Sequence, residues 1–333
     1  MEPDAVDRRT FVAALGSCTA HLFFTLGAAT AGARRLFAAP RGNPVIGREP
    51  WGRLEKLTEG AWALISTPLA GGPDAMRTIS NGGIIAGREG VAVVEGLGSE
   101  QGARWLADAA LELTGRWPTH VILTHYHSDH SNGLAAFRTE GRTPLYYSTT
   151  KTREDLVASV RDRDRPSSAV ATLRAERVTL VDAEAVTLDL GGRRLRIVPR
   201  AGHTRSDLVV ILEDPHLVWC GDLVWNGLFP NYIDARPSEL SRHVRALRGE
   251  PAERWVPGHG SLADAGALDV YLALLDDVEA AARRGLEAGR PVEVIARDYH
   301  PPAGLGEWVL FSPRYYETAF RAWARELGGG ATE

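Results

Sequence analysis

The residues most able to do chemistry in this chain lie together in residues 124–130, which read Thr-His-Tyr-His-Ser-Asp-His. Imidazole and carboxylate groups bind zinc, iron or manganese. The apolar residues directly before the segment predict a buried strand. Side chains two residues apart in an extended chain point the same way, so His125 and His127 can bind one point in space. Asp129 and His130 follow at a predicted turn into the next helix and can bind a second point nearby.

Three more potential ligands follow predicted strands, at positions expected to be loops. They are His203 in Gly-His-Thr, Asp222 in Gly-Asp, and His259 in Gly-His-Gly. The flanking glycines let the backbone approach closely and direct a side chain inward. The chain has two cysteines, Cys18 and Cys220, which excludes a disulfide framework and a Cys-rich structural zinc site. Cys220 is interpreted as a small core residue.

These motifs, in this order, resemble those of the metallo-β-lactamase fold superfamily over residues 55–260. The resemblance implies an α/β (α+β) chain folded as a four-layer αβ/βα sandwich, with the metal site at one edge of the two sheets. An aspartate at position 222, where the best-known zinc β-lactamases have a cysteine, is similar to the glyoxalase II and lactonase branch. By the resemblance, the first metal is held by His125, His127 and His203, the second by Asp129, His130 and His259, and both by Asp222.

The function implied by the resemblance is hydrolysis of an ester, thioester, lactone or amide. Two Zn²⁺ ions are expected, with Fe or Mn as other possibilities. Two such ions share a water and yield hydroxide at neutral pH, which Asp129, as the catalytic residue, would also orient. Two alternatives stay open: an oxygen-dependent oxidation of a sulfur compound by one iron in the same fold, and a non-enzymatic periplasmic protein that binds metal or serves a quinoprotein.

Four other residues are candidates near this site. Glu95 follows an early Val-Val strand, where the superfamily often has an aspartate, and is expected either to support a metal ligand or to face solvent. Asn226, Asn231 and Tyr232 belong to an aromatic and amide-rich stretch after Asp222. They either bind substrate or form a loop packed against the sheet. The C-terminal part has no glutathione-binding motif that can be aligned, so a glutathione thioester is not implied.

Composition limits the classes of partner. The chain has 333 residues, 44% of them hydrophobic and 24% charged, with a net charge of −4. These are values of a globular protein, and the negative balance argues against a nucleic-acid partner. A small-molecule substrate is expected, and the composition sets no oligomeric state.

The N-terminal residues predict a targeting signal. Arg8 and Arg9 precede Phe11, and no charged side chain follows from Thr10 to Ala33. This pattern resembles a twin-arginine export signal, cleaved near Ala33 or Ala39, which implies a periplasmic or otherwise exported protein. If uncleaved, the segment would anchor the protein in a membrane. The domain interpretation is therefore a signal at 1–39, the metallo-β-lactamase-fold domain at 40–262, and a C-terminal helical extension at 263–333.

Hydrophobic periodicity predicts the remaining elements. A Gly191-Gly192 turn between alternating runs predicts a hairpin over 186–198. Residues 40–60 are expected to wrap the surface, and the charged residues 151–177 to form an exposed loop or frayed helix. Strands are predicted at 61–66, 83–86, 91–94, 121–123, 144–147, 208–212 and 217–220, and helices at 101–113, 132–137, 237–248, 268–282 and 316–327.

Overall fold

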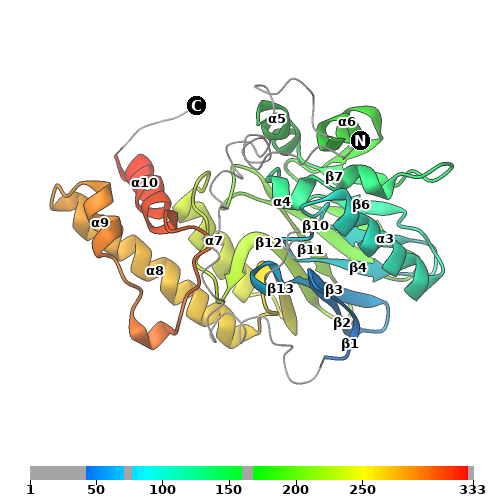
Figure 1. Ribbon diagram of the computed structural model, residues 1–333, viewed down its shortest axis with the longest axis horizontal. Helices are drawn as coiled ribbons and strands as arrows, with labels where there is room; N and C mark the ends of the chain where they lie inside the picture. The colour runs from blue at the N-terminus through cyan, green and yellow to red at the C-terminus, as the bar shows by residue number, and fades with distance from the viewer. Residues whose placement is uncertain (1–42, 71–76, 160–167, 329–333) are drawn as a thin grey trace, which may run out of the picture.

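The computed structural model describes residues 43–70, 77–159 and 168–328, so the predicted signal at 1–39 lies outside the described residues. The chain forms two facing β-sheets with helices on the outer side of each, as Figure 1 shows. Strands one to five of the first sheet pair antiparallel, and the remaining strands continue it in parallel. Its order is β1 (Val45–Glu49), β2 (Gly52–Thr58), β3 (Ala61–Ser66), β4 (Gly82–Ala86), β5 (Val91–Val94), β6 (His120–Ile122), β7 (Leu145–Ser148) and β8 (Val178–Leu180).

The second sheet is antiparallel apart from its last, parallel pair. The predicted hairpin is present, with Gly191 and Gly192 at φ 87° and 79° and both of their amides bonded to the Asp189 carboxylate. Two successive residues with positive φ are what a tight hairpin turn requires. The order is β13 (Arg254–Gly260), β12 (Leu217–Asn226), β11 (Asp207–Leu212), β10 (Arg194–Arg200) and β9 (Val186–Asp189).

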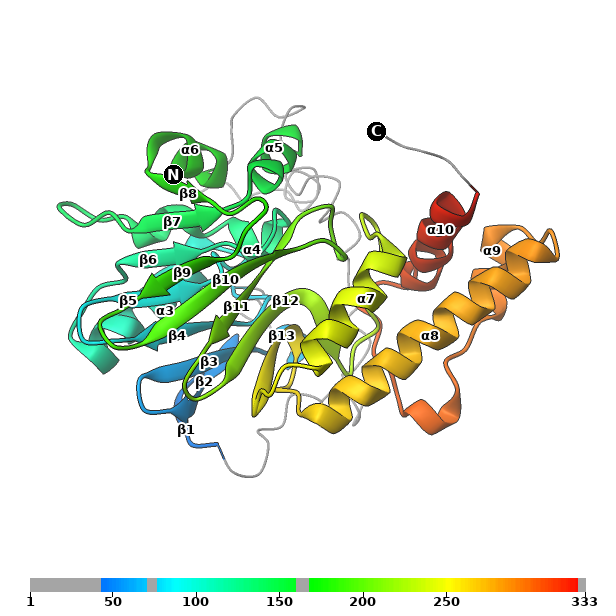
Figure 2. The ribbon, with the colours of Figure 1, turned by 180° about the vertical axis from the view of Figure 1, so that it is seen from behind.

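The helices complete a four-layer arrangement, seen from both sides in Figures 1 and 2. One apolar cluster lies between the first sheet and its helices, one between the sheets, and one between the second sheet and the C-terminal helices. Side chains of β3 and β11 alternate between two of these clusters, because neighbouring residues of a strand face opposite ways. The helices are α3 (Glu100–Thr114), α4 (Ser128–Ser131), α5 (Thr150–Ala158), α6 (Ser168–Ala175), α7 (Pro237–Arg248), α8 (Ala265–Glu287), α9 (Val292–Asp298) and α10 (Tyr315–Leu327).

The side chain of Asn81 links the two sheets close to the predicted ligand His259. The Asn81 amide nitrogen donates to the carbonyls of Pro257 and Gly260, at 2.9 and 2.8 Å. Its carbonyl oxygen accepts from the backbone amide of Ser66, at 2.8 Å. Asn81 is buried and bridges β3 of the first sheet to β13 of the second, so it fixes the segment that carries His259.

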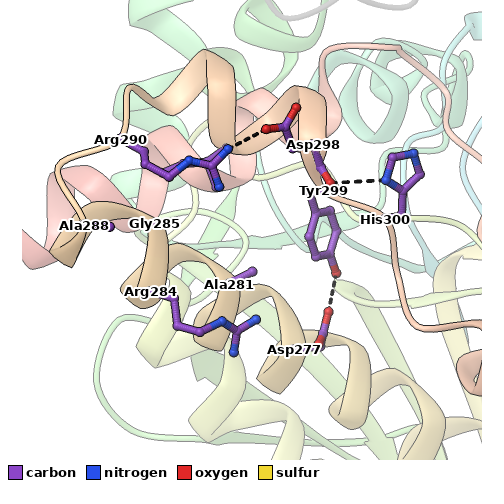
Figure 3. A pocket seen from close by; sticks show the side chains of 10 residues that line it. Asp277, Ala281, Arg284, Gly285, Ala288, Arg290, Asp298, Tyr299 and His300 are labelled. Atoms are coloured by element: carbon purple, nitrogen blue, oxygen red, sulfur yellow. Dashed lines mark hydrogen bonds and ion pairs between the residues drawn. The ribbon is translucent and has the colours of Figure 1, made fainter.

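The C-terminal helices pack on the second sheet. Helices α8, α9 and α10 share one apolar cluster with β12 and α7. Figure 3 shows polar links in this region: the Tyr299 hydroxyl donates to Asp277 on α8 at 2.9 Å, and Arg290 pairs with Asp298 of α9. In the described parts of the chain, no helix is long and apolar enough to cross a bilayer.

Three local predictions are wrong. Residues 40–60 were expected to wrap the surface, but they contain the strands β1 and β2. Residues Gly52 to Glu55 of β2 are buried in the first sheet. Within 151–177, the described residues form α5 and α6, which bury Leu156, Val170 and Leu173 despite a weak periodic pattern. The helix predicted at 132–137 is a short 3-10 turn, Leu134–Phe137, preceded by α4.

Candidate metal centre

The predicted ligands meet at one edge of the two sheets. His125 and His127 follow β6, and His127 is also the N-terminal cap of α4, the short helix that carries Asp129 and His130. The other three ligands come from the second sheet. His203 follows β10, while Asp222 lies within β12 and His259 within β13.

The prediction that Asp222 and His259 are loop residues is therefore wrong in detail. The pairing of β12 with β13 is irregular between Trp219 and Trp225, and Gly221 adopts φ 53°. These irregularities direct the side chain of Asp222 into the site from within a strand. Gly258 is required there, because a Cβ atom on it would lie 1.9 Å from Asp222 Oδ1.

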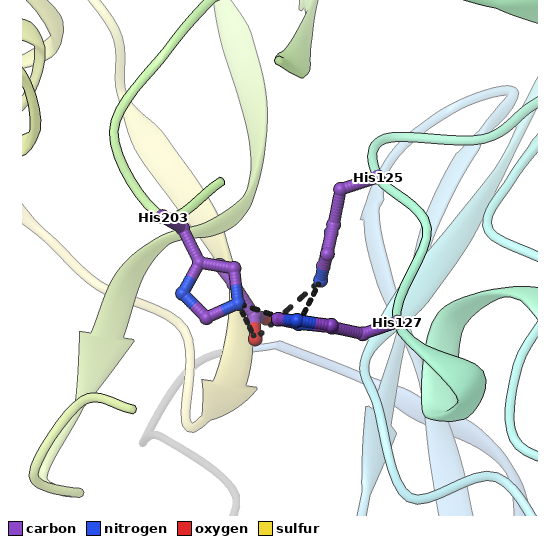
Figure 4. A group of neighbouring side chains, drawn as sticks. His125, His127 and His203 are labelled. Carbon is purple, nitrogen blue, oxygen red and sulfur yellow. Dashed lines mark hydrogen bonds and ion pairs between the residues drawn. The ribbon is translucent and has the colours of Figure 1, made fainter. Parts of the chain in front are cut away.

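The first cluster consists of three imidazoles and one carboxylate oxygen. His127 Nδ1 lies 3.1 Å from His125 Nε2 and 2.9 Å from His203 Nε2. Asp222 Oδ2 lies 3.2 Å from His203 Nε2 and 3.8 Å from His125 Nε2. Figure 4 shows the three rings converging on one point. All four residues are buried, as a ligand set for one cation requires.

The second cluster contains Asp129, His130 and His259. Asp129 Oδ2 lies 3.5 Å from His130 Nε2 and 3.3 Å from His259 Nε2. Asp222 contributes its other oxygen here, with Oδ1 at 3.0 Å from His130 Nε2 and 3.4 Å from His259 Nε2. Asp222 thus directs one oxygen to each cluster.

The donor atoms fit divalent cations. Among the described residues, His130 Nε2, His259 Nε2 and Asp222 Oδ1 are buried without a hydrogen-bond partner. Buried polar atoms without partners are costly, and a cation bound between them would satisfy all three at once. Imidazole and carboxylate ligands suit Zn²⁺, Fe or Mn, and they do not select one of these.

The electrostatics of the two clusters differ. Burial lowers the pKa of His125 well below its usual value and that of His203 to about 3, so both are neutral ligands. Burial acts the same way on His130, but the carboxylates of Asp222, Glu95 and Asp129 raise its pKa well above the usual value. Without a cation, the second cluster therefore holds positive charge on His130.

Glu95 supports the second cluster, as the first of its two interpretations expected. The side chain is 2% exposed, which excludes the solvated alternative. Its Oε1 lies 3.0 Å from His130 Nδ1 and accepts from the Thr124 hydroxyl at 2.5 Å. A carboxylate on the far nitrogen of a ligand imidazole fixes the ring and its tautomer, so Nε2 of His130 is directed at the site.

Asp234 does the same for the first cluster, and the sequence did not reveal it. Its Oδ2 lies 2.9 Å from His127 Nε2 and accepts from the Tyr126 hydroxyl at 2.6 Å. His127 consequently presents Nδ1 to the other two imidazoles. No local motif marks Asp234, because it is joined to His127 only by the folding of the loop after β12.

The predicted substrate residues have structural contacts. The Asn226 amide donates to the carbonyls of Ser261 and Leu262, both at 3.1 Å. Asn231 Oδ1 accepts from the amide of Ile233, and Tyr232 is buried in the C-terminal core beside Phe229. These contacts are those of a packed loop, and a role of the three residues in substrate binding stays a prediction.

Aromatic side chains surround the ligand His259. The Trp225 ring lies 4.1 Å from the His259 ring, centre to centre, at an interplanar angle of 37°. Phe311, which precedes α10, lies edge-on to His259 at 5.3 Å. Segments well beyond the ligand motifs therefore contribute to this side of the site.

The ligand set and fold agree with a comparison to known families, in which the model of the Metallo-beta-lactamase superfamily matches residues 76–259. The chain belongs to the metallo-beta-lactamase superfamily. The matched span contains all seven predicted ligands: His125, His127, Asp129, His130, His203, Asp222 and His259.

Several curated proteins with similar sequences carry the names of hydrolases. The hydroxyacylglutathione hydrolase of Shewanella baltica is 23% identical over 135 residues, which are 40% of this chain and 44% of that one. The enzyme of the same name from Rhodospirillum rubrum is 25% identical, over 62% of this chain and 71% of its own length. An acyl-coenzyme A thioesterase of Homo sapiens is 24% identical over 167 residues, which are 45% of this chain and 59% of that one. The match with the first of these relatives thus spans less than half of its length. Together the relatives support a metallo-hydrolase, and they do not identify its substrate.

Solved structures share the fold. A stereoselective inverting sec-alkylsulfatase from Pseudomonas sp. matches with a TM-score of 0.66 at 14% identity, over 99% of this chain and 63% of that one. The DIM-1 metallo-beta-lactamase matches with a TM-score of 0.53 at 22% identity, over 71% and 99%. The mixed α/β sandwich predicted from the sequence is confirmed.

Proposed function

We propose that this protein is an exported, dinuclear zinc hydrolase that cleaves an ester, thioester, lactone or amide. The observation that carries the proposal is the position of Asp222, whose two oxygens lie 3.2 Å from His203 Nε2 and 3.0 Å from His130 Nε2. A carboxylate shared in this way suits two cations held close together.

Two cations at these clusters would lower the pKa of a shared water and polarise a substrate carbonyl. The protein residues provide the geometry for that chemistry. Asp129 lies between His130 and His259 and, buried though it is, has its pKa lowered to about 2 by these imidazoles. It stays ionised through the neutral range, so it can accept a hydrogen bond from water and orient it toward the acyl carbon.

The acyl class is favoured by the names of the similar curated proteins, which are hydrolases of hydroxyacylglutathione and acyl-coenzyme A. Thioester cleavage is accordingly the first activity to test. Export rests on the Arg8-Arg9 pattern and the uncharged stretch after it. A membrane anchor remains the outcome expected if cleavage does not occur.

The deciding experiment combines metal analysis with a substrate panel. The full chain, purified with its metals, is analysed for zinc, iron and manganese and assayed on thioesters, lactones, esters and a chromogenic β-lactam. Two zinc ions per chain with acyl hydrolysis are expected. One iron per chain with oxygen uptake would replace the proposal with a dioxygenase, and metal without turnover on any substrate would favour a binding protein.

A fusion experiment tests export. Residues 1–39 joined to a reporter that works only outside the cytoplasm should give activity, and replacement of Arg8 and Arg9 by lysine should abolish it. Activity that survives this replacement would contradict a twin-arginine route.

A further inference from the structure

The start of α10 forms a wall of the second ligand cluster. The Trp225 ring, which stacks on His259, meets the Tyr315 ring edge-on at 6.1 Å and 82°. Phe311 also packs on Trp225, at 5.8 Å, and on His259, at 5.3 Å. Residues 311–315 therefore reach the metal centre from the C-terminal region, beyond the span matched by the superfamily.

Tyr315 is the polar residue of this wall. Its side chain is 4% exposed. Its backbone is held, since its amide donates to the Ser312 carbonyl and its carbonyl accepts from the Thr318 hydroxyl. The phenol hydroxyl itself makes no hydrogen bond within the described chain, so its donor is available to a bound molecule.

The electrostatic surroundings keep this phenol protonated. Burial raises the pKa of the Tyr315 hydroxyl above its ordinary value. The phenol ring lies against Trp225, and the Trp225 ring stacks on the ligand His259, so a single ring separates Tyr315 from the second cluster. Tyr315 is consequently a donor throughout the neutral pH range, and it does not serve as a base.

We propose that Tyr315 is a catalytic residue that donates a hydrogen bond to the acyl oxygen of the substrate, an inference that rests on the proposed hydrolase function. When the water oxygen bonds to the acyl carbon, the electron pair of the carbonyl moves to its oxygen, which becomes negative. The Tyr315 hydroxyl stabilises that charge and keeps its own proton. The pair then reforms the carbonyl as the bond to the leaving group breaks, and the leaving group takes up a proton that came from the water.

The neighbouring tyrosine provides a matched control. Tyr316 packs against Phe229 at 4.8 Å and Tyr299 at 5.2 Å, within the core of the C-terminal helices. It is on the same helix as Tyr315 and of the same type, and it contacts no ligand of the clusters among its ring contacts. Loss of its hydroxyl tests any general effect on α10.

The experiment compares Tyr315→Phe and Tyr316→Phe in the zinc-loaded full chain. Tyr315→Phe should retain both zinc ions and lower kcat on the best acyl substrate about 100-fold, as removal of one donor to a developing oxyanion does elsewhere. Its KM should change much less, and Tyr316→Phe should stay within about twofold of the parent protein. An unchanged kcat, or loss of zinc from Tyr315→Phe, would overturn the proposal.

A second measurement does not depend on turnover. Inorganic phosphate carries several anionic oxygens in tetrahedral geometry, and its binding to the cobalt-loaded protein is followed by visible absorption. Tyr315→Phe should raise the phosphate Kd about tenfold, while Tyr316→Phe should leave it unchanged. Equal Kd values for both variants would refute the role of Tyr315. If the parent protein cleaves no substrate, the hydrolase proposal fails while this titration still decides whether Tyr315 binds an oxyanion.

Discussion

Replacement of Glu95 by glutamine should weaken one metal and spare the other. The carboxylate lies 3.0 Å from His130 Nδ1 and is 2% exposed, so its charge acts on that imidazole with little screening. Glutamine keeps the size of the side chain and removes the charge. Loss of such a partner costs about 10- to 100-fold in metal affinity, which is about 1.4 to 2.7 kcal/mol.

Asp234→Asn is the matched change on the other side. Asp234 Oδ2 lies 2.9 Å from His127 Nε2, so the same reasoning assigns its effect to the first cluster. Competition with a chelator of known zinc affinity gives the two dissociation constants of each variant. Anomalous scattering at the zinc edge, from crystals of each variant, then locates the site that has lost occupancy.

The expected pattern is reciprocal. Glu95→Gln should lose zinc at Asp129, His130 and His259, and Asp234→Asn should lose it at the three-histidine cluster. Equal losses at both positions in both variants would refute the separation of the two supports. Two unchanged affinities in Glu95→Gln would refute the role of this carboxylate altogether.

Four further outcomes follow from the site. Asp222→Ala should keep the fold, seen by circular dichroism, and lose at least one metal; full metal content with full rate would contradict its shared position. Gly258→Ala should reduce zinc content, measured by elemental analysis, because its Cβ would lie 1.9 Å from Asp222 Oδ1. Metal loading should release protons, because the raised pKa of His130 keeps the metal-free cluster protonated at neutral pH. Calorimetry in buffers of different ionisation enthalpy measures this release. Metal affinity should accordingly rise as the pH rises through the pKa of His130 and fall in acid. Trp225→Ala should lower the free energy of unfolding by about 3–5 kcal/mol, measured by denaturant titration, since the ring is 2% exposed.

The ligands could be found from the sequence because their signals are local. The segment after β6 concentrates four donors, and the glycines beside His203, Asp222 and His259 show where the backbone must bend or approach closely. The strands β3 and β11 were found for a similar reason, because they are short apolar runs bounded by charged or turn-forming residues.

Other features depend on contacts between distant segments. Asp234 and Tyr315 gain their positions only when the loop after β12 and the start of α10 fold onto the site. The helices α5 and α6 were missed because their apolar stripes are narrow, and tertiary packing of Leu156 and Val170 stabilises them more than local pattern does. The strands β1 and β2 were missed because glycine and proline are frequent around them and favour turns and loops.

Because its ligands are divided between the two sheets, the metal centre binds cations only as tightly as the packing of the two sheets allows. Four ligands belong to the first sheet and its following segments, and three to the second, with Asn81 as a further bridge between β3 and β13. Cations that bind only the assembled form contribute their binding free energy to that assembly. A substitution in the apolar layer between the sheets, remote from every ligand, should therefore weaken zinc retention before it changes any other property. Measuring the resistance of such variants to a chelator would map the energetics of the packing between the two sheets.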